Sequence, residues 1–442
     1  MRKKISFALA AMMLLSISPL TACKNENGGL KKGENVLRIA SWDEYIDMGG
    51  EDSYYSPDSL PIYEEFEAWY NTQHPDKPIT VEYVALQDNE TMYNKIKMGD
   101  DYDLLCPSEY MAMKLKEEDR LLPFDKTFFD PTIEGNYYAQ NVSPYTVDIF
   151  KSQGLYEYIA GYMWGSTGFV YNPEKFGQSP TEAREIMSSW YCLSNEACKR
   201  RITAKDNVRD SYFMGLGMYY EKELLALDPT NPNYAATLSE KMNDISVETM
   251  AEVKELLVKA RRNLYGLETD EGKTDVAAGR LDASYQWSGD AVYIMDMAEE
   301  NVLTLEYSIP KSASNLWFDG WVMMKEANVE AATAFVNYIS MPENIVRNMY
   351  YIGYTSCLGG EEVYDYICET YGAEEDDKTA VEYDLSYFFG EGFEPLLVPE
   401  EQTRRQLFAQ YPDVVTKNRL VVMKYFDKQA NERANRMWNN IK

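Results

Sequence analysis

The first third of the chain alternates between strand-like and helix-like patterns of apolar residues. Residues 36–40 form a short apolar run, residues 61–70 repeat apolar side chains at three- and four-residue spacing, and residues 79–84 alternate apolar with polar. Short runs and strict alternation are typical of β-strands, whereas the longer repeat is typical of an amphipathic helix. Residues 103–106 predict another strand, and residues 123–154, rich in Pro, Asp and Tyr, are predicted to be irregular. The order strand, helix, strand predicts a βαβ unit.

A second set of such elements follows. Residues 168–172 and 283–287 read as strands, and residues 250–260 and 332–339 place apolar side chains on one helical face. An amphipathic segment ends the chain near Trp438. Two α/β lobes fit a chain of this length.

The N-terminal segment has the features of a secretory signal. Three basic residues precede an apolar run over residues 5–17, which is too short to span a bilayer as a mature helix. The sequence Leu20-Thr21-Ala22-Cys23 resembles the bacterial lipobox, in which the cysteine is lipidated and the peptide is cut before it. We therefore expect a signal peptide at residues 1–22 and a lipid-anchored tether at residues 23–35. The protein should then be extracytoplasmic and anchored to the bacterial membrane.

The net charge of the chain indicates which kinds of partner it can bind. The formal net charge is -29, which repels nucleic acid and anionic headgroups and raises the local concentration of cations. We expect no nucleic-acid partner.

The cysteines offer few chemical roles. In an oxidising compartment Cys192 with Cys198, and Cys357 with Cys368, are close enough in sequence to close short disulfide loops, and Cys106 lies in a strand-like apolar run that predicts a buried thiol. The sequence alone does not fix this pairing. No pair has the C-x-x-C spacing, which disfavours zinc binding and thioredoxin chemistry. We expect no metal and no cofactor.

Three short stretches place tryptophan next to carboxylates. A ring face with acids at its edge suits an organic cation, since a desolvated ammonium gains about 2 kcal/mol from the ring and about 1.5–3 kcal/mol from a charged hydrogen bond. The stretches are Trp42-Asp43-Glu44-Tyr45, Trp287-Ser288-Gly289-Asp290 and Trp317-Phe318-Asp319.

These residues are predicted to lie at strand ends. Trp42 follows the first strand, Ser108 and Tyr110 follow the strand at residues 103–106, and Asp290 follows a later one. Ligands of open α/β sheets bind outside the carboxyl ends of the strands, and two-lobed proteins bind small molecules between the lobes. The pattern predicts a receptor for amines.

The chain resembles the extracytoplasmic polyamine-binding receptors of ABC importers, of the spermidine/putrescine type. The resemblance covers nearly all of residues 36–438, with extra residues around 48–60 and 360–400. It is carried by eight short motifs in the same order: Ser41-Trp42-Asp43-Glu44-Tyr45, Asn89-Glu90-Thr91-Met92-Tyr93, Tyr102-Asp103-Leu104 with Pro107-Ser108, Met163-Trp164-Gly165, Val208-Arg209-Asp210, Trp287-Ser288-Gly289-Asp290, Trp317-Phe318-Asp319 and Ile352-Gly353-Tyr354.

The resemblance implies an α/β, two-lobed periplasmic-binding-protein type fold with a hinge and an interlobe ligand cleft. Crossovers near Gly165, Asp319 and Cys357 would divide the chain into lobe 1 at residues 36–165 and 320–357, and lobe 2 at residues 166–319 and 358–442. The ligand-binding residues that it implies are Trp42, Asp43, Glu44, Tyr45, Ser108, Tyr110, Asn207, Asp210, Trp287, Asp290, Trp317, Asp319 and Tyr354.

The implied function is the capture of a polyamine and its delivery to an ABC permease in the membrane by a monomeric, non-enzymatic lipoprotein. Spermidine-preferring relatives carry an acid where Asn207 stands, so the choice between putrescine and spermidine stays open. For Ser108, a turn or helix-capping role competes with ligand contact.

Other functions remain as alternatives. A sugar receptor would also stack rings on tryptophan but has no need for several acids in one cleft. A secreted hydrolase could use two carboxylates, although the single histidine, His74, disfavours histidine-based triads and metal sites. An adhesive or structural lipoprotein would lack a pocket that excludes water.

Overall fold

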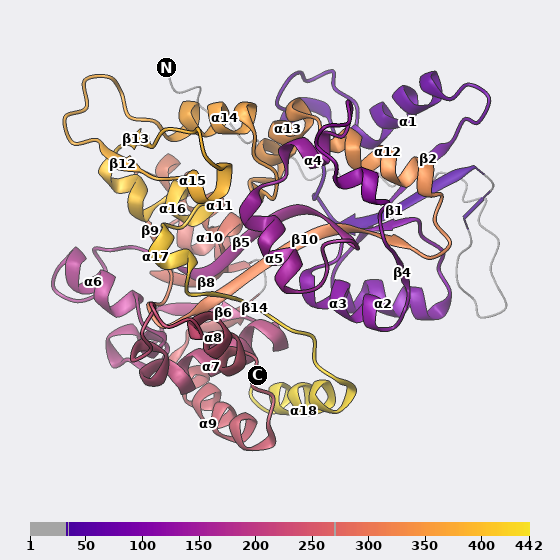
Figure 1. The fold of residues 1–442 in the computed structure, drawn as a ribbon. Coiled ribbons are helices and arrows are strands. Elements are labelled where there is room, and N and C mark those ends of the chain that lie inside the picture. Colours follow the sequence, from indigo (N-terminus) through magenta and orange to yellow (C-terminus); the bar gives the residue numbers. More distant parts are fainter. Residues whose placement is uncertain (1–31, 34, 269–270) are drawn as a thin grey trace.

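Residues 32–33, 35–268 and 271–442 are described by a computed structural model. The predicted signal peptide and Cys23 lie outside these residues. Figure 1 shows two lobes side by side, each a sheet covered by helices, with two long strands running between them. This arrangement confirms the predicted α/β, two-lobed fold class. Within the described residues, no helix combines the length and apolar character needed to cross a bilayer.

The first lobe is built on a parallel sheet in which β1 (Val36–Trp42) lies between β2 (Thr80–Leu86) and β3 (Leu104–Leu105). The five central residues of β1 are buried, as expected for a parallel strand covered on both faces. Helices cover the two faces (Figure 1): α1 (Ile62–Gln73), α12 (Val329–Ile339) and α13 (Pro342–Ile352) on one, α2 (Asn89–Met98) and α3 (Glu109–Glu117) on the other.

Residues 123–154 are more regular than predicted. They contain α4 (Tyr137–Asn141) and α5 (Pro144–Ser152), after the short β4 (Leu121–Leu122) and η2 (Lys126–Phe129). The hydroxyl of Ser143 caps α5, and Pro144 occupies its first turn, where proline is tolerated. The proline content predicts irregular structure here, but Pro144 instead starts a helix.

The second lobe repeats the design. In its sheet β8 (Ala283–Trp287) pairs in parallel with β6 (Ile202–Lys205), which in turn pairs with β7 (Gly266–Glu268). The predicted strand at residues 283–287 is confirmed, as is the helix around residues 250–260. The other elements of this part of the chain are α6 (Pro180–Met187), η3 (Trp190–Ser194), η4 (Glu196–Cys198), α7 (Val208–Leu225), α8 (Tyr234–Met242), α9 (Val247–Asn263), α10 (Glu271–Ala277), α11 (Ser288–Glu300) and β9 (Glu306–Ser308).

Two long antiparallel strands join the lobes. β5 (Ile159–Tyr171) pairs with β10 (Ser314–Met324) through residues 159–166 and with β8 through residues 167–171. The short β11 (Thr355–Ser356) pairs with β5 beside them. The register of β5 and β10 shifts between Asp319 and the next residue, a bulge that re-aims a side chain at the crossover.

Residues 358–411 contact both lobes. Phe388 belongs to the core of the first lobe, and its carbonyl accepts a hydrogen bond from Ser143 Oγ (2.6 Å). Gln406, by contrast, donates to Asp296 Oδ1 (3.0 Å) on α11 of the second lobe. The sequence-based division, which places this segment in lobe 2, remains a prediction. The elements here are α14 (Glu361–Tyr371), β12 (Val381–Tyr383), α15 (Ser386–Phe389), β13 (Leu396–Val398), η5 (Glu400–Arg404) and α16 (Gln406–Gln410).

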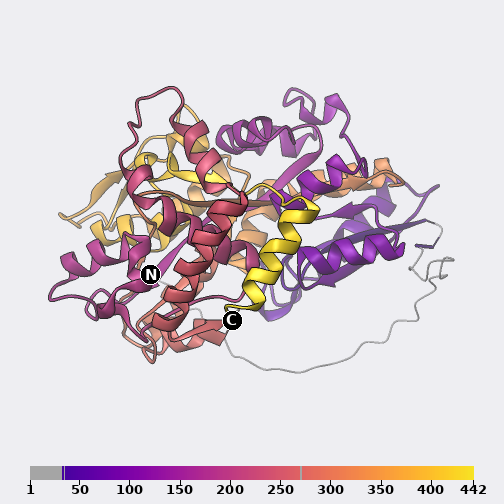
Figure 2. The same cartoon turned by 90° about the horizontal axis from the view of Figure 1, so that it is seen from below.

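The chain then returns to the second lobe. After α17 (Val414–Lys417), β14 (Leu420–Val422) pairs in parallel with β10, and α18 (Lys428–Asn439) packs its Ala434, Met437 and Trp438 into the core of that lobe. Figure 2 shows this yellow helix along the red helices of the second lobe, on the side nearer the first. The predicted C-terminal amphipathic helix is confirmed.

The short-loop disulfides are not formed, because all five described cysteines are free thiols. Cys192 and Cys198 are buried in the core of the second lobe, where they pack as small apolar side chains. Cys357 is buried at the crossover, whereas Cys368 is half-buried on α14. Cys106 is buried, as predicted.

A buried ion pair fixes the loop that follows β1. Arg347 Nε on α13 donates to Asp47 Oδ2 (2.8 Å), and both side chains are buried, at 4% and 0% exposure. A second contact joins Arg347 Nη1 to Glu65 Oε2 on α1 (2.6 Å). Tyr45 lies in this loop and Trp42 directly precedes it at the end of β1, so the ion pair helps to position two rings predicted to bind ligand.

We predict that Arg347→Met lowers the free energy of unfolding by about 3–5 kcal/mol, because it leaves the Asp47 carboxylate buried and unpaired. Urea denaturation measures the effect. The matched control is Arg280→Met, which breaks the exposed pair with Asp275 and should cost less than about 1 kcal/mol. Equal losses for the two variants would contradict this account.

Candidate functional site

Asp319 lies at the crossover of β10 and accepts hydrogen bonds from two aromatic residues of the first lobe. Trp42 Nε1 donates to Asp319 Oδ2 at 3.0 Å, and the Tyr45 hydroxyl donates to the same oxygen at 2.8 Å. The side chain is 5% exposed, and Oδ1 has no hydrogen-bond partner among the described residues. A buried carboxylate oxygen without a partner is costly, so this atom can gain from a cationic donor.

The electrostatics of Asp319 follow from its burial. Desolvation raises its pKa, while the side chains of Ser108, Tyr45 and Trp42 lower it, and burial prevails. Nearby, burial and the charge of Asp319 raise the pKa of Glu109 to about 8, although the carboxylate accepts a hydrogen bond from the Phe318 amide (3.2 Å). A proton is therefore held beside Asp319 at neutral pH.

A second acid, Asp290, lies in the first turn of α11, just after Trp287. The Tyr354 hydroxyl and Lys273 Nζ contact its Oδ1 at 3.0 Å and 2.8 Å, and Lys205 Nζ lies 3.3 Å from its Oδ2. Burial opposes ionisation, but Lys205, Lys273 and Tyr354 outweigh it and hold the pKa of Asp290 below its usual range. Asp290 is thus a paired, ionised carboxylate.

Trp287 presents its ring to a cation of the protein itself. Lys205 Nζ lies 4.0 Å from the ring centroid, a cation–π distance. Asp210 lies near the same group: burial raises its pKa to about 6, while Lys205, Arg209 and Trp287 lower it. The predicted ring and the two predicted acids therefore surround an ammonium.

The central part of the site is aromatic. The ring of Tyr354 lies 5.9 Å from that of Tyr45 and 5.5 Å from that of Trp317, measured between centroids. A Cβ at Gly289 would come within 1.9 Å of the Tyr354 ring, so only glycine allows this close approach. Tyr354 thus links the Asp319 end of the site to Asp290.

The two lobes touch beside the site. The guanidinium of Arg209, on the second lobe, lies 4.5 Å from the ring centroid of Tyr110 on the first and 3.9 Å from that of Phe426. Arg209 also donates to the carbonyl of Lys424, and the Tyr110 hydroxyl lies 3.3 Å from Glu90 Oε1. The two lobes are therefore in direct contact at this point.

Three of the predicted site residues, Asp43, Glu44 and Asn207, have other surroundings, whereas Ser108 lies beside Asp319. Asp43 and Glu44 are exposed. Asn207 caps α7, its side-chain oxygen accepting from the amides of Arg209 (2.7 Å) and Asp210. Ser108 makes no capping bond; its Oγ accepts from the Asn89 side chain (3.0 Å), and its backbone bridges to that of Asp319.

The sequence prediction missed the positive side chains Lys205, Lys273 and Arg209 and the neutral acid Glu109. Lys205 ends a strand and Arg209 precedes a predicted acid, so the strand-end argument applied to basic residues could have found both. Glu109 lies between the predicted residues Ser108 and Tyr110, so the same argument applies to it. Lys273 carries no comparable signal, because its proximity to the site depends on helix packing.

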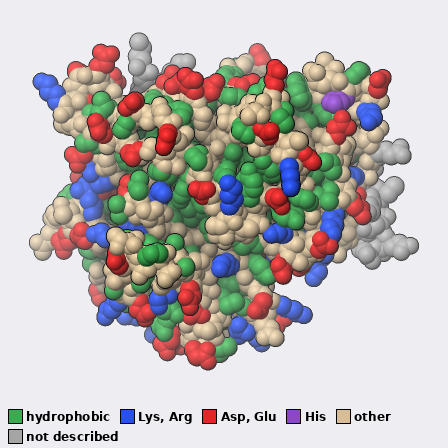
Figure 3. Space-filling view, viewed as in Figure 1, with side chains coloured by type: hydrophobic (Ala, Val, Ile, Leu, Met, Phe, Trp, Pro, Cys, Tyr) green, Lys and Arg blue, Asp and Glu red, His purple; other side chains and the backbone are tan. Residues whose placement is uncertain are grey.

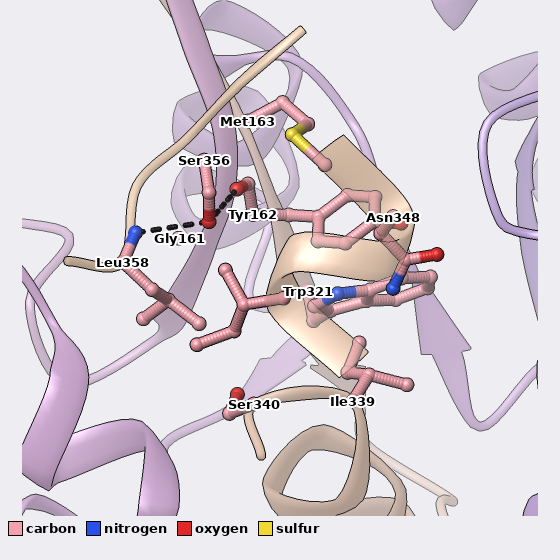
Figure 4. A pocket seen from close by; sticks show the side chains of 10 residues that line it. Gly161, Tyr162, Met163, Trp321, Ile339, Ser340, Asn348, Ser356 and Leu358 are labelled. Atoms are coloured by element: carbon pink, nitrogen blue, oxygen red, sulfur yellow. Dashed lines mark hydrogen bonds between the residues drawn. The ribbon is translucent and has the colours of Figure 1, made fainter. Parts of the chain in front are cut away.

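A small cavity lies on another side of the crossover (Figure 4). It is lined by β5, β10 and α13 residues, including Tyr162, Trp321 and Asn348, and has a volume of about 10 Å³. That is room for about one water molecule. The Ser356 hydroxyl donates to the Tyr162 carbonyl here (3.3 Å) and ties β11 to β5. The cavity is too small for a polyamine.

The sequence of this chain matches a known protein family. The profile of the family described as "bacterial extracellular solute-binding protein" matches residues 62–360. The chain belongs to this family. The protein is therefore a solute-binding protein, and the predicted resemblance is confirmed.

Individual relatives extend the comparison. The chain is 25% identical over 330 residues to the putrescine-binding periplasmic protein SpuD of Pseudomonas aeruginosa, covering 73% of this chain and 79% of the relative. It is 23% identical to the putrescine-binding periplasmic protein PotF of Escherichia coli, covering 78% and 82%. A solved structure of the spermidine/putrescine substrate-binding protein PotD of Streptococcus pneumoniae superposes with a TM-score of 0.60 at 25% identity, covering 92% and 98%.

The raised pKa of Glu109 predicts a pH dependence of stability. A carboxyl group whose folded-state pKa exceeds its unfolded value stabilises the fold fully below the unfolded pKa, and this contribution is lost as pH rises through the folded pKa of about 8. Glu109→Gln should therefore reduce the loss of stability between about pH 5 and about pH 9.

Urea denaturation at both pH values measures this effect. Glu117→Gln, an exposed change on the same helix, is the control and should follow the wild-type profile. If Glu109→Gln loses as much stability as the wild type over this range, Glu109 is not the group that holds the proton.

Proposed function

We propose that the protein captures a linear polyamine between its lobes and delivers it to an ABC permease, without catalysing a reaction. The observation that carries the proposal is Asp319, a buried carboxylate with an oxygen that lacks a partner, surrounded by rings from separate chain segments. Relatives named as putrescine-binding proteins support the ligand class. An ammonium at Oδ1 would gain a charge-assisted hydrogen bond inside a closed cleft.

The chemistry of polyamines fits the alternation of rings and acids along this cleft. A polyamine carries charged nitrogens separated by methylenes, so its host needs carboxylates separated by flat apolar walls. Tyr354 and Trp317 lie between Asp319 and Asp290 and offer such walls. A neutral sugar would leave the buried Asp319 carboxylate without a counter-charge, which disfavours a sugar receptor.

The lobe boundaries, the hinge, the monomeric state and the lipid anchor belong to the same proposal. The strand pair β5–β10 and the adjacent β11 would act as the hinge, because all three chain crossings lie side by side there. Anchoring through Cys23 would keep the receptor near its permease at the outer face of the membrane.

We predict that Asp319→Asn weakens polyamine binding by about 2–5 kcal/mol, because it keeps the shape of the side chain but removes its charge from a contact that excludes water. Calorimetric titration with putrescine and spermidine measures the loss. Glu375→Gln, at an exposed loop position, should change affinity by less than about 1 kcal/mol. Equal affinities of wild type and Asp319→Asn would remove Asp319 from the site. Binding of a sugar or amino acid, with no binding of either amine, would refute the proposed ligand class.

A second prediction concerns the anchor. Cys23→Ala should move the protein from the membrane fraction to a soluble or unprocessed form, since the lipobox-like cysteine would carry the lipid. Fractionation of cells that express each form measures the change. Unchanged membrane association of Cys23→Ala would show that another feature holds the protein at the membrane.

A further inference from the structure

The ammonium of Lys205 lies beside Trp287 and Asp290, where the sequence motif predicts a ligand cation. Lys205 ends β6, its side chain is 2% exposed, and its Nζ lies 4.0 Å from the Trp287 ring centroid and 3.3 Å from Asp290 Oδ2. A ring face with an adjacent carboxylate is the environment expected for a bound ammonium. The environment is therefore filled by the chain itself.

The charges at the two ends of the cleft differ as a result. At the second-lobe end, Lys205 and Lys273 form ion pairs with Asp290 and neutralise it. The charges of Lys205 and Arg209 also lower the pKa of Asp210. At the Asp319 end the donors are the neutral side chains of Trp42 and Tyr45. No ion pair of the described residues reaches the Asp319 carboxylate, and its Oδ1 has no hydrogen-bond partner among them.

We propose that Lys205 is a specificity-determining residue: it fills the second-lobe cation subsite as a tethered ammonium, so that the cleft takes a short diamine in preference to a triamine. The inference rests on the proposed polyamine-binding function. A diamine can place one ammonium on Asp319. A triamine extended along the cleft would bring another ammonium toward Lys205, and repulsion between like charges inside a closed site discriminates strongly between ligands.

The test is a calorimetric comparison of putrescine with spermidine. Lys205→Met keeps an unbranched side chain but removes the charge, so it should raise the affinity ratio of spermidine to putrescine by at least about tenfold. The matched control is Lys222→Met, an equal change of charge at an exposed position on the same lobe, which should leave the ratio within about twofold of the wild type. A ratio that Lys205→Met leaves unchanged or lowers would overturn the inference.

A structure of the wild-type protein with putrescine decides the matter if Lys205→Met does not fold or binds neither amine. Lys205 Nζ should remain over the Trp287 ring, with a putrescine nitrogen at Asp319 Oδ1. A putrescine nitrogen over Trp287, with Lys205 displaced, would overturn the inference while leaving the proposed function intact. If wild type and variants bind no amine at all, the proposed function itself fails.

Discussion

The buried carboxylate of Asp319 is the constraint on which the arrangement of this protein depends. Burying an ionised group without a counter-charge is expensive, and here burial keeps the pKa of Asp319 raised even with three polar side chains acting against it. The fold supplies those side chains from separate places: Trp42 at the end of β1, Tyr45 in the loop that follows, and Ser108 at the start of α3. The buried Arg347–Asp47 pair then fixes the loop that carries Tyr45, one of the donors. Several parts of the first lobe thus contact the Asp319 carboxylate or hold the residues that do.

The same crossover that buries Asp319 also connects the lobes mechanically. β5 runs without interruption from one sheet into the other, so a rotation of one lobe must bend β5, β10 and β11 where they lie side by side. Residues 358–411 contact both lobes near these strands, through Phe388 on one side and Gln406 on the other. If the lobes separate, the contacts of this segment with at least one of them must break or slide.

Sequence patterns predicted the fold further than the site. Strong helical repeats, such as that of α9, and short apolar runs, such as β8, fixed the element types, because burial alone determines those patterns. The strand-end rule also brought together Trp42, Asp319, Trp287 and Asp290. The strand-end rule could not show that the side-chain oxygen of Asn207 caps a helix, because the same residue type serves as a helix cap and as a ligand contact. Nor could it show which cations neutralise which acids, because Lys205 and Lys273 reach Asp290 only through the packing of β6 and α10 against α11.

The net charge of the protein acts on a ligand over a longer distance than the individual charged groups of the site do. The net charge of -29 raises the concentration of any cation near the protein, but Figure 3 shows acidic and basic side chains interspersed over the face it presents, so no single-signed patch there points to the cleft. At physiological ionic strength such long-range fields are screened beyond about 8 Å, whereas a contact inside the closed cleft is not. Selection among amines must therefore be made by local contacts. Those contacts are a carboxylate with an open oxygen at one end, and at the other a carboxylate that the protein has already neutralised.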